Sequence, residues 1–202
     1  MFDRLIIFVK APRLGFVKTR LAKHLGNEAA LDAYRTVAQL LLSNLKSFSC
    51  VELRFSPDEA INEISPWLLH PEWTAQPQGN GDLGQRLTRA FDEAFSSGAR
   101  SVAIIGSDCP DLLPADIEEA WVALESNDLV LGPAQDGGYW LIALRKAAPM
   151  LFEGVAWSSE FVLEQTMAKA AAAGLKVHLL RQLADIDTAS DWERFVKGRA
   201  GR

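Results

Sequence analysis

The sequence predicts an α/β protein, a three-layer Rossmann-like sandwich built on a mostly parallel sheet. Apolar runs that suit strands buried on both faces alternate along the chain with segments of 3.6-residue helical periodicity. The strand patterns at 128–132 and 139–144 stand too close together for a crossover helix between them. We therefore expect at least one antiparallel strand in the sheet.

The first part of the chain supplies two strands and two helices. Residues 5–9 read as a buried parallel strand, and helical pattern begins at Val17. A longer helix follows the Gly26-Asn27 pair, with apolar residues at helical spacing over 31–48. Residues 51–55 alternate like a half-exposed strand.

Capping residues and turn residues mark the later elements. Ser56-Pro57-Asp58-Glu59 has the N-cap, N1 and N3 pattern of a short helix. Further helices are expected after Asp82 with Gln85 at N3, from Pro114, from Ser158 to about Ala173 with Gly174 ending it, and from the capping box Thr188–Asp191. Further strands are expected at 102–105, 128–132, 139–144 and 175–180, and residues 73–78 read as a strand or as an extended connection.

The composition indicates one globular domain that binds neither nucleic acid nor membrane. The 202 residues carry a formal net charge of −5, whereas nucleic-acid binding needs a basic face. No apolar run approaches the roughly 20 residues of a membrane span, and the first residues lack the apolar segment of a signal peptide. We expect a cytoplasmic protein with one domain over 1–196 and a frayed tail over 197–202, and a homodimer is left open.

The polar segment Gly106–Asp111 follows the apolar strand pattern 102–105. Ligands of open α/β sheets lie at the carboxyl ends of strands, and carboxylates buried there need a partner. Clustered carboxylate oxygens suit Mg²⁺ or Mn²⁺, which makes Asp108 a candidate metal ligand, while a simple turn is the alternative. Cys109 is expected to be small buried filler, because no His pairs with it.

Basic residues gather in the loop that follows the first strand. Lys10, Lys18 and Arg20 add full charges to the free N–H groups at a helix start. The loop holds a single glycine, Gly15, so it is neither a P-loop nor a dinucleotide fingerprint. It indicates a site for a small anion, with a solvated basic helix face as the alternative.

Two further groups of polar residues accompany this loop. Glycines in the segment 78–86 let the backbone approach a flat ligand closely, and Asp82 there also caps a helix. Later strand ends carry Asp136-Gly137-Gly138-Tyr139, Trp157-Ser158 and Asp185-Ile186-Asp187. Either Asp185 or Asp187 would complete a metal site with Asp108, although Asp187 suits a helix cap equally well.

Five motifs occur together and in order: Lys-x-Pro-x-x-Gly-x-x-Lys-Thr-Arg-Leu (10–21), Gly-Asp-Leu-Gly-Gln-Arg-Leu (81–87), Gly-Ser-Asp-Cys-Pro-Asp-Leu (106–112), Gly-Pro-Ala-x-Asp-Gly-Gly-Tyr (132–139) and Asp-Ile-Asp-Thr (185–188). With them the chain resembles uncharacterised bacterial transferases of the nucleotide-diphospho-sugar transferase superfamily. These are similar to 2-phospholactate guanylyltransferase and to MobA-like nucleotidyltransferases. The resemblance spans nearly the whole chain and implies the GT-A fold.

The resemblance also implies roles for individual residues. The nucleotide would be bound by Lys10, Pro12, Gly15, Lys18, Arg20, Gly81, Asp82 and Gly84. The acceptor would be bordered by Asp136, Gly137, Gly138, Tyr139 and Trp157. Mg²⁺ or Mn²⁺ would be held by Asp108 with Asp187 or Asp185, and Lys18 and Asp108 would be catalytic.

Three functions follow as hypotheses. The first is metal-dependent transfer of a nucleotidyl group from an NTP to a small phosphorylated or anionic acceptor, in which metal and cationic side chains stabilise the phosphoryl charge. The second is glycosyl transfer from a nucleotide-sugar. The third is a non-catalytic nucleotide-binding regulator, against which the retained carboxylates at 108, 111, 185 and 187 argue.

Overall fold

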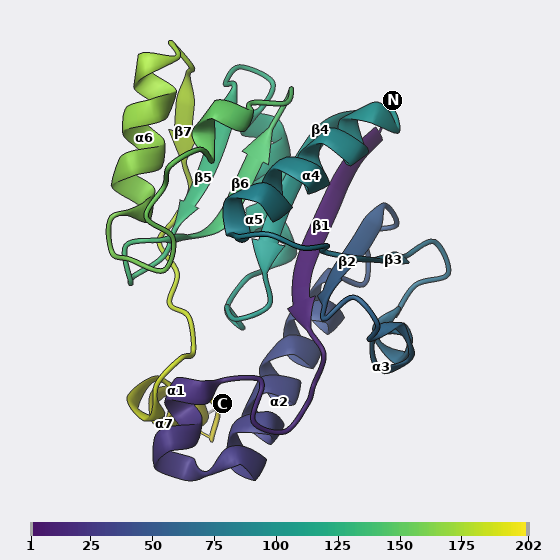
Figure 1. Cartoon of the computed structure of the whole chain (residues 1–202), viewed down its shortest axis with the longest axis vertical. Coiled ribbons are helices and arrows are strands. Elements are labelled where there is room, and N and C mark those ends of the chain that lie inside the picture. The colour runs from purple at the N-terminus through teal and green to yellow at the C-terminus, as the bar shows by residue number, and fades with distance from the viewer. Residues whose placement is uncertain (1, 201–202) are drawn as a thin grey trace.

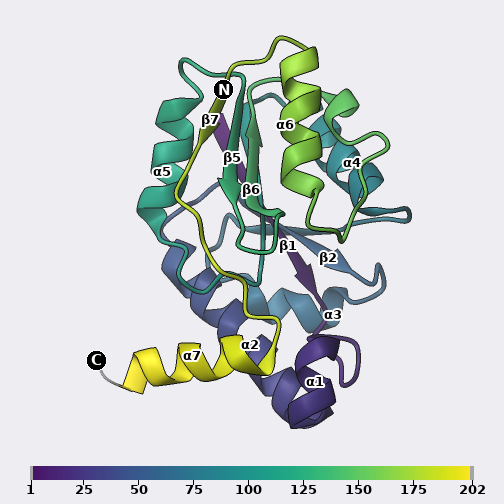
Figure 2. The ribbon, with the colours of Figure 1, turned by 90° about the vertical axis from the view of Figure 1, so that its left-hand side faces the viewer.

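The computed structural model describes residues 2–200, which form a seven-stranded sheet between two layers of helices (Figures 1 and 2). The elements in chain order are β1 (Phe2–Lys10), α1 (Thr19–Leu25), α2 (Asn27–Leu45), β2 (Val51–Ser56), α3 (Ile61–Ile64), η1 (Ser65–Trp67), β3 (Thr74–Pro77), α4 (Leu83–Ser96), β4 (Ala99–Gly106), α5 (Pro114–Ala123), β5 (Leu129–Pro133), β6 (Tyr139–Leu144), η2 (Pro149–Leu151), α6 (Val162–Ala172), β7 (Val177–Leu179) and α7 (Ala189–Ala200). The segments η1 and η2 are single 3₁₀ turns.

The sheet has the strand order β3-β2-β1-β4-β6-β5-β7. Strand β6 runs antiparallel to both of its neighbours, β4 and β5, and all other pairs are parallel. This arrangement confirms the predicted α/β class and the antiparallel strand. Because the remaining strands share one direction, their carboxyl ends meet at one edge of the sheet.

The core lies on both faces of the sheet, as expected for strands that are apolar throughout. In β1, Leu5, Ile7 and Val9 point into the cluster that includes α2 and α5, whereas Ile6 points into the cluster of α4 and α6. Figure 2 shows α5 on one side of the sheet and α4 with α6 on the other. Each strand therefore buries alternate residues against different helices.

Two elements differ from the sequence-based expectation. Strand β2 is buried rather than half exposed, because Glu52 and Arg54, its alternate polar residues, pair with each other and are each 2% exposed. The expected helix cap at Ser56 is wrong: Ser56 ends β2, and α3 begins only at Ile61. A local capping pattern cannot show that its first residue already belongs to a sheet.

Two expectations near the carboxyl end also change. Ser158 does not cap α6, which begins at Val162 after the residue Phe161; Ser158 instead has a left-handed backbone with φ of 64°. Gly174, with φ of 67°, follows the end of this helix as expected. The tail expected to fray from residue 197 is helical as far as Ala200, and residues 201–202 lie outside the described residues.

Helix α7 lies away from the sheet, beside α1 (Figures 1 and 2). After β7 the chain runs as an irregular strap over 180–188. Thr188 and Asp191 then form the predicted capping box at the start of α7. Trp192 and Ala189 then pack against the small cluster of Leu21, Ala30 and Ala33. Within residues 2–200, no helix combines the length and apolar character needed to cross a lipid bilayer.

Candidate active site

A cleft of about 800 Å³ opens at the edge where the parallel strands end. Its walls come from the loops after β1 and β4, the start of α4, the turn before β6 and the strap over 180–188. The residues predicted from the sequence that line it are Lys10, Lys18, Arg20, Asp108, Asp136, Gly138, Tyr139, Trp157, Asp185 and Asp187. Segments from the beginning, middle and end of the chain thus meet in one cavity.

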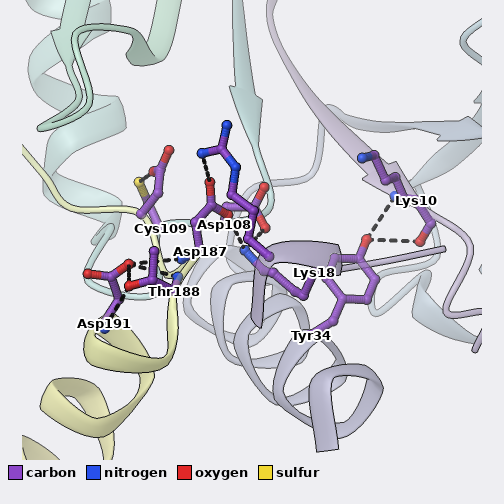
Figure 3. Close-up of polar contacts among 10 residues, drawn as sticks. Lys10, Lys18, Tyr34, Asp108, Cys109, Asp187, Thr188 and Asp191 are labelled. Atoms are coloured by element: carbon purple, nitrogen blue, oxygen red, sulfur yellow. Dashed lines mark hydrogen bonds and ion pairs between the residues drawn. The ribbon is translucent and has the colours of Figure 1, made fainter. Parts of the chain in front are cut away.

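The ammonium group of Lys18 occupies the centre of this site. Lys18 Nζ forms an ion pair with Asp108 Oδ1 and lies 3.1 Å from Asp187 Oδ1, while its side chain is 3% exposed (Figure 3). Burial disfavours the charged form of Lys18, but the two carboxylates outweigh burial and hold its pKa above the usual value. The three side chains form a charge cluster with one more negative than positive charge.

Backbone geometry places Lys18 at the cluster. The residue directly precedes α1 and has a left-handed conformation, with φ of 47° and ψ of 44°. Such a conformation is uncommon outside glycine, and residues that adopt it cluster at functional sites. It turns the chain from the basic loop into the helix with the side chain directed toward Asp108.

The segments that carry the two carboxylates are joined through the backbone. The amide N–H of Ile186 donates to the carbonyl oxygen of Asp108 at 3.1 Å. The loop after β4 and the strap before α7 therefore lie together, which brings Asp108 and Asp187 to one point although they are 79 positions apart in the sequence.

Asp185 faces a different partner. The thiol of Cys109, which is 2% exposed, donates to Asp185 Oδ1. Burial, with smaller contributions from the charges of Asp108, Asp136 and Asp187, raises the pKa of Asp185 to about 6, against the lowering effect of the thiol hydrogen bond. Burial and the neighbouring Asp185 likewise raise the pKa of the Cys109 thiol well above its usual value. Of the two late carboxylates, Asp187 is the one that shares a partner with Asp108.

Tyr34 of α2 fixes the start of the basic loop. Its hydroxyl donates to the carbonyl oxygen of Lys10 at 2.8 Å and accepts from the N–H of Lys10 at 2.7 Å (Figure 3). The ammonium of Lys10 forms no ion pair within residues 2–200. Arg13, by contrast, is held by Glu59 and Glu63 and is already neutralised.

The turn before β6 packs against the segment that leads into α6. Gly137 has φ of 88°, and a Cβ there would lie 2.1 Å from the carbonyl oxygen of Glu160. Its own carbonyl oxygen accepts from the N–H of Leu163 at 2.9 Å. Only glycine fits this contact, which joins the turn that carries Asp136 to the segment 158–163, and both Asp136 and Trp157 line the cleft.

Several residues predicted to bind the nucleotide or acceptor lie outside the lining of the cleft. Asp82 forms the predicted capping box with Gln85, and Gly84 lets α4 approach Phe152 and Trp157, where a Cβ would lie 2.8 Å from each. Their ligand-binding roles stay predictions. The residues concerned are Pro12, Gly15, Gly81, Asp82, Gly84 and Gly137.

The residues predicted for the site leave out several polar residues that line the cleft, among them Tyr34, Gln78, Arg86 and Ser107. Arg86 and Ser107 belong to the quoted motifs and were open to recognition by position. Gln78 begins the segment 78–86, but its contact with Val9 and the contact of Tyr34 with Lys10 reach segments distant in sequence, so no local signal marks either contact.

The donor set suits a divalent cation that also contacts phosphates. No group of three or more His, Cys, Asp or Glu side chains within residues 2–200 is arranged to hold a metal by itself. Mg²⁺ commonly takes one or two carboxylates and completes its shell with water and substrate phosphates. Asp108 and Asp187, which converge on one positive charge, match that smaller requirement.

The fold, with its cleft at the ends of the parallel strands, is that of the nucleotide-diphospho-sugar transferases. A solved structure from Desulfovibrio desulfuricans G20, assigned by its description to that group, is 33% identical, with a TM-score of 0.89 over 98% of this chain and 88% of that one. The chain belongs to the family described as "Uncharacterized protein conserved in bacteria (DUF2064)", whose sequence model matches residues 42–159. The resemblance inferred from the motifs is thereby confirmed.

Curated relatives and a more distant fold relative complete the comparison. A phosphoenolpyruvate guanylyltransferase of Sphaerobacter thermophilus is 27% identical over 195 residues, covering 95% of this chain and 92% of the relative. One from Chloroflexus aggregans is 29% identical over 153 residues, or 72% and 74% of the two chains. The 4-diphosphocytidyl-2C-methyl-D-erythritol synthase of Anaerococcus prevotii shares the fold, with a TM-score of 0.66 at 14% identity over 100% of this chain and 99% of that one.

Proposed function

We propose that the protein is a metal-dependent nucleotidyltransferase that transfers a nucleoside monophosphate from an NTP to a small phosphorylated or carboxylated acceptor. The observation that carries the proposal is the buried Lys18 ammonium between Asp108 and Asp187 in the cleft. The names of the curated relatives make GTP the first donor and phosphoenolpyruvate the first acceptor to test.

The chemistry needs positioned charge rather than a protein nucleophile. An acceptor oxygen forms a bond to the α-phosphorus of the NTP while the bond from that phosphorus to the bridging oxygen breaks, and pyrophosphate leaves with the electron pair. Catalysis of such a step is mainly orientation and stabilisation of charge on the phosphoryl oxygens. Cys109 is unsuited to attack, because its thiol is buried and its pKa is raised.

Each element of the cluster has a part in this proposal. Asp108 and Asp187 would hold Mg²⁺ or Mn²⁺, which when bound neutralises charge on the phosphate oxygens. Lys18 keeps its proton at neutral pH, because the carboxylates raise its pKa, so it adds a fixed positive charge. Lys10, free of any carboxylate partner within residues 2–200, adds a second positive charge at the end of β1.

The test is an assay of pyrophosphate release. Each of the four NTPs is incubated with Mg²⁺ or Mn²⁺ and with a panel of phosphoenolpyruvate, other small phosphorylated acids and plain carboxylic acids, and the nucleotide product is identified by mass spectrometry. The proposal predicts pyrophosphate in a fixed ratio to a nucleotidylated acceptor. If none of the four NTPs yields pyrophosphate, the proposal is overturned. Consumption of nucleotide-sugars alone would replace it by glycosyl transfer.

A further inference from the structure

Four cationic side chains line the cleft, and they differ in how far their charge is already compensated. Lys18 is paired with two carboxylates, and Arg20 Nη1 lies 4.0 Å from Asp187 Oδ2. Lys10 and Arg86 form no ion pair with any carboxylate within residues 2–200. These two residues are therefore the uncompensated positive charges of the cleft.

Arg86 is held in place by neutral acceptors. Its Nε donates to the carbonyl oxygen of Gly81 at 2.9 Å, and its Nη1 donates to Oε1 of Gln78 at 3.2 Å. An arginine has five N–H donors, and these contacts leave Nη2 and one N–H of Nη1 for another acceptor. The guanidinium is thus oriented without losing its charge.

Gln78 is itself fixed by the ends of two strands. Its side chain is buried, and Nε2 donates to the carbonyl oxygens of Val9 at 3.1 Å and Arg54 at 2.9 Å. These contacts determine which side-chain atom is the amide nitrogen, so Oε1 must face Arg86. A glutamine with both ends engaged is a rigid support for the guanidinium.

We propose that Arg86 binds an anionic group of the substrate, a phosphate or a carboxylate, and that Gln78 is the residue that positions it. A guanidinium fork suits the oxygens of either group, and the free Nη2 supplies the donors. The proposal rests on the proposed function only in taking this cleft as the substrate site; anion binding itself requires no turnover.

The test measures binding by calorimetry. Each probe is added alone, so that donor and acceptor are never present together and no reaction occurs. The probes are GTP, inorganic pyrophosphate, phosphoenolpyruvate and, as an uncharged reference, guanosine. The variants are R86M and R86K. The matched control is R100M, which removes an exposed arginine at the opposite end of β4, where Arg100 pairs with Asp3.

We expect R86M to weaken binding of an anionic probe by about tenfold to a hundredfold, the usual effect of losing a hydrogen bond to a charged group. A loss for GTP and pyrophosphate assigns Arg86 to the nucleotide phosphates, and a loss for phosphoenolpyruvate assigns it to the acceptor. R86K should bind more weakly than the natural protein, because one ammonium cannot hold Gly81 and Gln78 and also reach a ligand. R100M should bind all probes unchanged.

Three results would overturn the proposal: unchanged affinity of R86M for every anion, an equal loss for guanosine, or no anion binding by the natural protein. Anion binding without pyrophosphate release in the assay above would instead reject the proposed reaction and leave Arg86 assigned. The role of Gln78 is tested with Q78E, which places a carboxylate beside the guanidinium. It should weaken anion binding in the natural background and add nothing in the R86M background, with melting curves verifying the fold of each variant; equal effects in both backgrounds would reject the positioning role.

Discussion

Lys18 illustrates how a buried charge depends on its partners. An ammonium at 3% exposure is stable only beside opposite charge, and Asp108 and Asp187 supply it. The two carboxylates bring one negative charge more than Lys18 compensates. A divalent cation bound there would more than offset that excess and would compete with Lys18 for the same oxygens, so metal affinity and the position of Lys18 are linked.

At this residue scale, Asp108→Asn should lower turnover by about 10²- to 10³-fold, the usual effect of removing one charge-stabilising group from an active site. The amide leaves Lys18 paired with Asp187 alone and weakens the cation site. Steady-state rates of pyrophosphate release over a range of Mg²⁺ concentrations measure both effects. Asp111→Asn is the matched control, because Asp111 is exposed and lies outside the cleft lining; equal losses in both variants would contradict the assignment.

The two cysteines should differ sharply in reactivity. Cys50 is exposed, whereas Cys109 is buried and the pKa of its thiol is raised by burial and by Asp185. Only thiolates react readily, so at pH 8 a disulfide reagent should modify one thiol in the native protein and both in denaturant. A Cys50→Ser variant should react with none while folded. Rapid modification of Cys109 in that variant would show that the site opens far more than the contacts allow.

At the scale of elements, β2 shows how distant residues decide the environment of a strand. Arg54 pairs with Glu52 on its own strand and with Glu93 of α4, whose Oε2 lies 2.6 Å from Arg54 Nη2. Arg4 of β1 adds a 2.9 Å contact to Glu52. The polar alternation of β2 therefore faces α4 and its neighbouring strand through ion pairs rather than facing water.

Replacing Arg54 with Met should lower the free energy of unfolding by about 3–5 kcal/mol, because Glu52 would stay buried with too little positive charge beside it. Urea unfolding followed by far-UV circular dichroism gives the value. The double variant Glu52→Leu/Arg54→Met removes both buried charges and should recover part of the loss. If the double variant loses as much additional free energy of unfolding as Glu52→Leu loses alone, the two side chains act independently and the pairing argument is wrong.

The elements that could be predicted from the sequence are those whose signals are local. The capping boxes at Asp82 and Thr188 and the close spacing of β5 and β6 each act within a few residues, and the structure contains all three. The exposure of β2 could not be predicted, because Glu93 lies about 40 positions from its partner Arg54. A capping pattern at Ser56 was equally misleading, since sheet pairing takes precedence over a local cap.

The candidate site follows the same rule. Asp108, Lys18 and Asp187 stand in motifs at strand ends, where chemistry in open α/β sheets is expected, and the cleft brings them together. Gln78 and Tyr34 act through hydrogen bonds to backbone groups of β1, and nothing in their own neighbourhood marks those partners. Charged residues in strand-end motifs are therefore easier to find from sequence than the residues that support them through distant backbone contacts.

At the scale of the whole molecule, the C-terminal helix links the site to α1. Trp192 packs on the cluster of Leu21, Ala30 and Ala33, and Asp191 accepts from the N–H groups of Asp187 and Thr188 at 3.3 and 2.8 Å. Helix α7 makes these contacts away from the sheet core (Figure 1). Its packing therefore bears on the position of Asp187 more than on the stability of the sheet.

Trp192→Ala should lower turnover by roughly tenfold to a hundredfold through displacement of Asp187, since small misplacements of catalytic groups have effects of that size. The cost in unfolding free energy should stay within about 0.5–3 kcal/mol, because Trp192 is only half buried. Kinetics and thermal melting on the same preparation separate the two. Val196→Ala, an exposed change on the same helix, should affect neither; a large stability loss with unchanged turnover in Trp192→Ala would contradict the link.

The ion pair between Lys18 and Asp187 joins positions 169 residues apart. A ribosome making this chain releases every strand of the sheet before it releases Asp187, so a nascent chain can collapse around its core while it still lacks half of the proposed cation site. A chain truncated between β7 and Asp187 would therefore keep every strand of the sheet and still lack one of the two carboxylates of the proposed cation site.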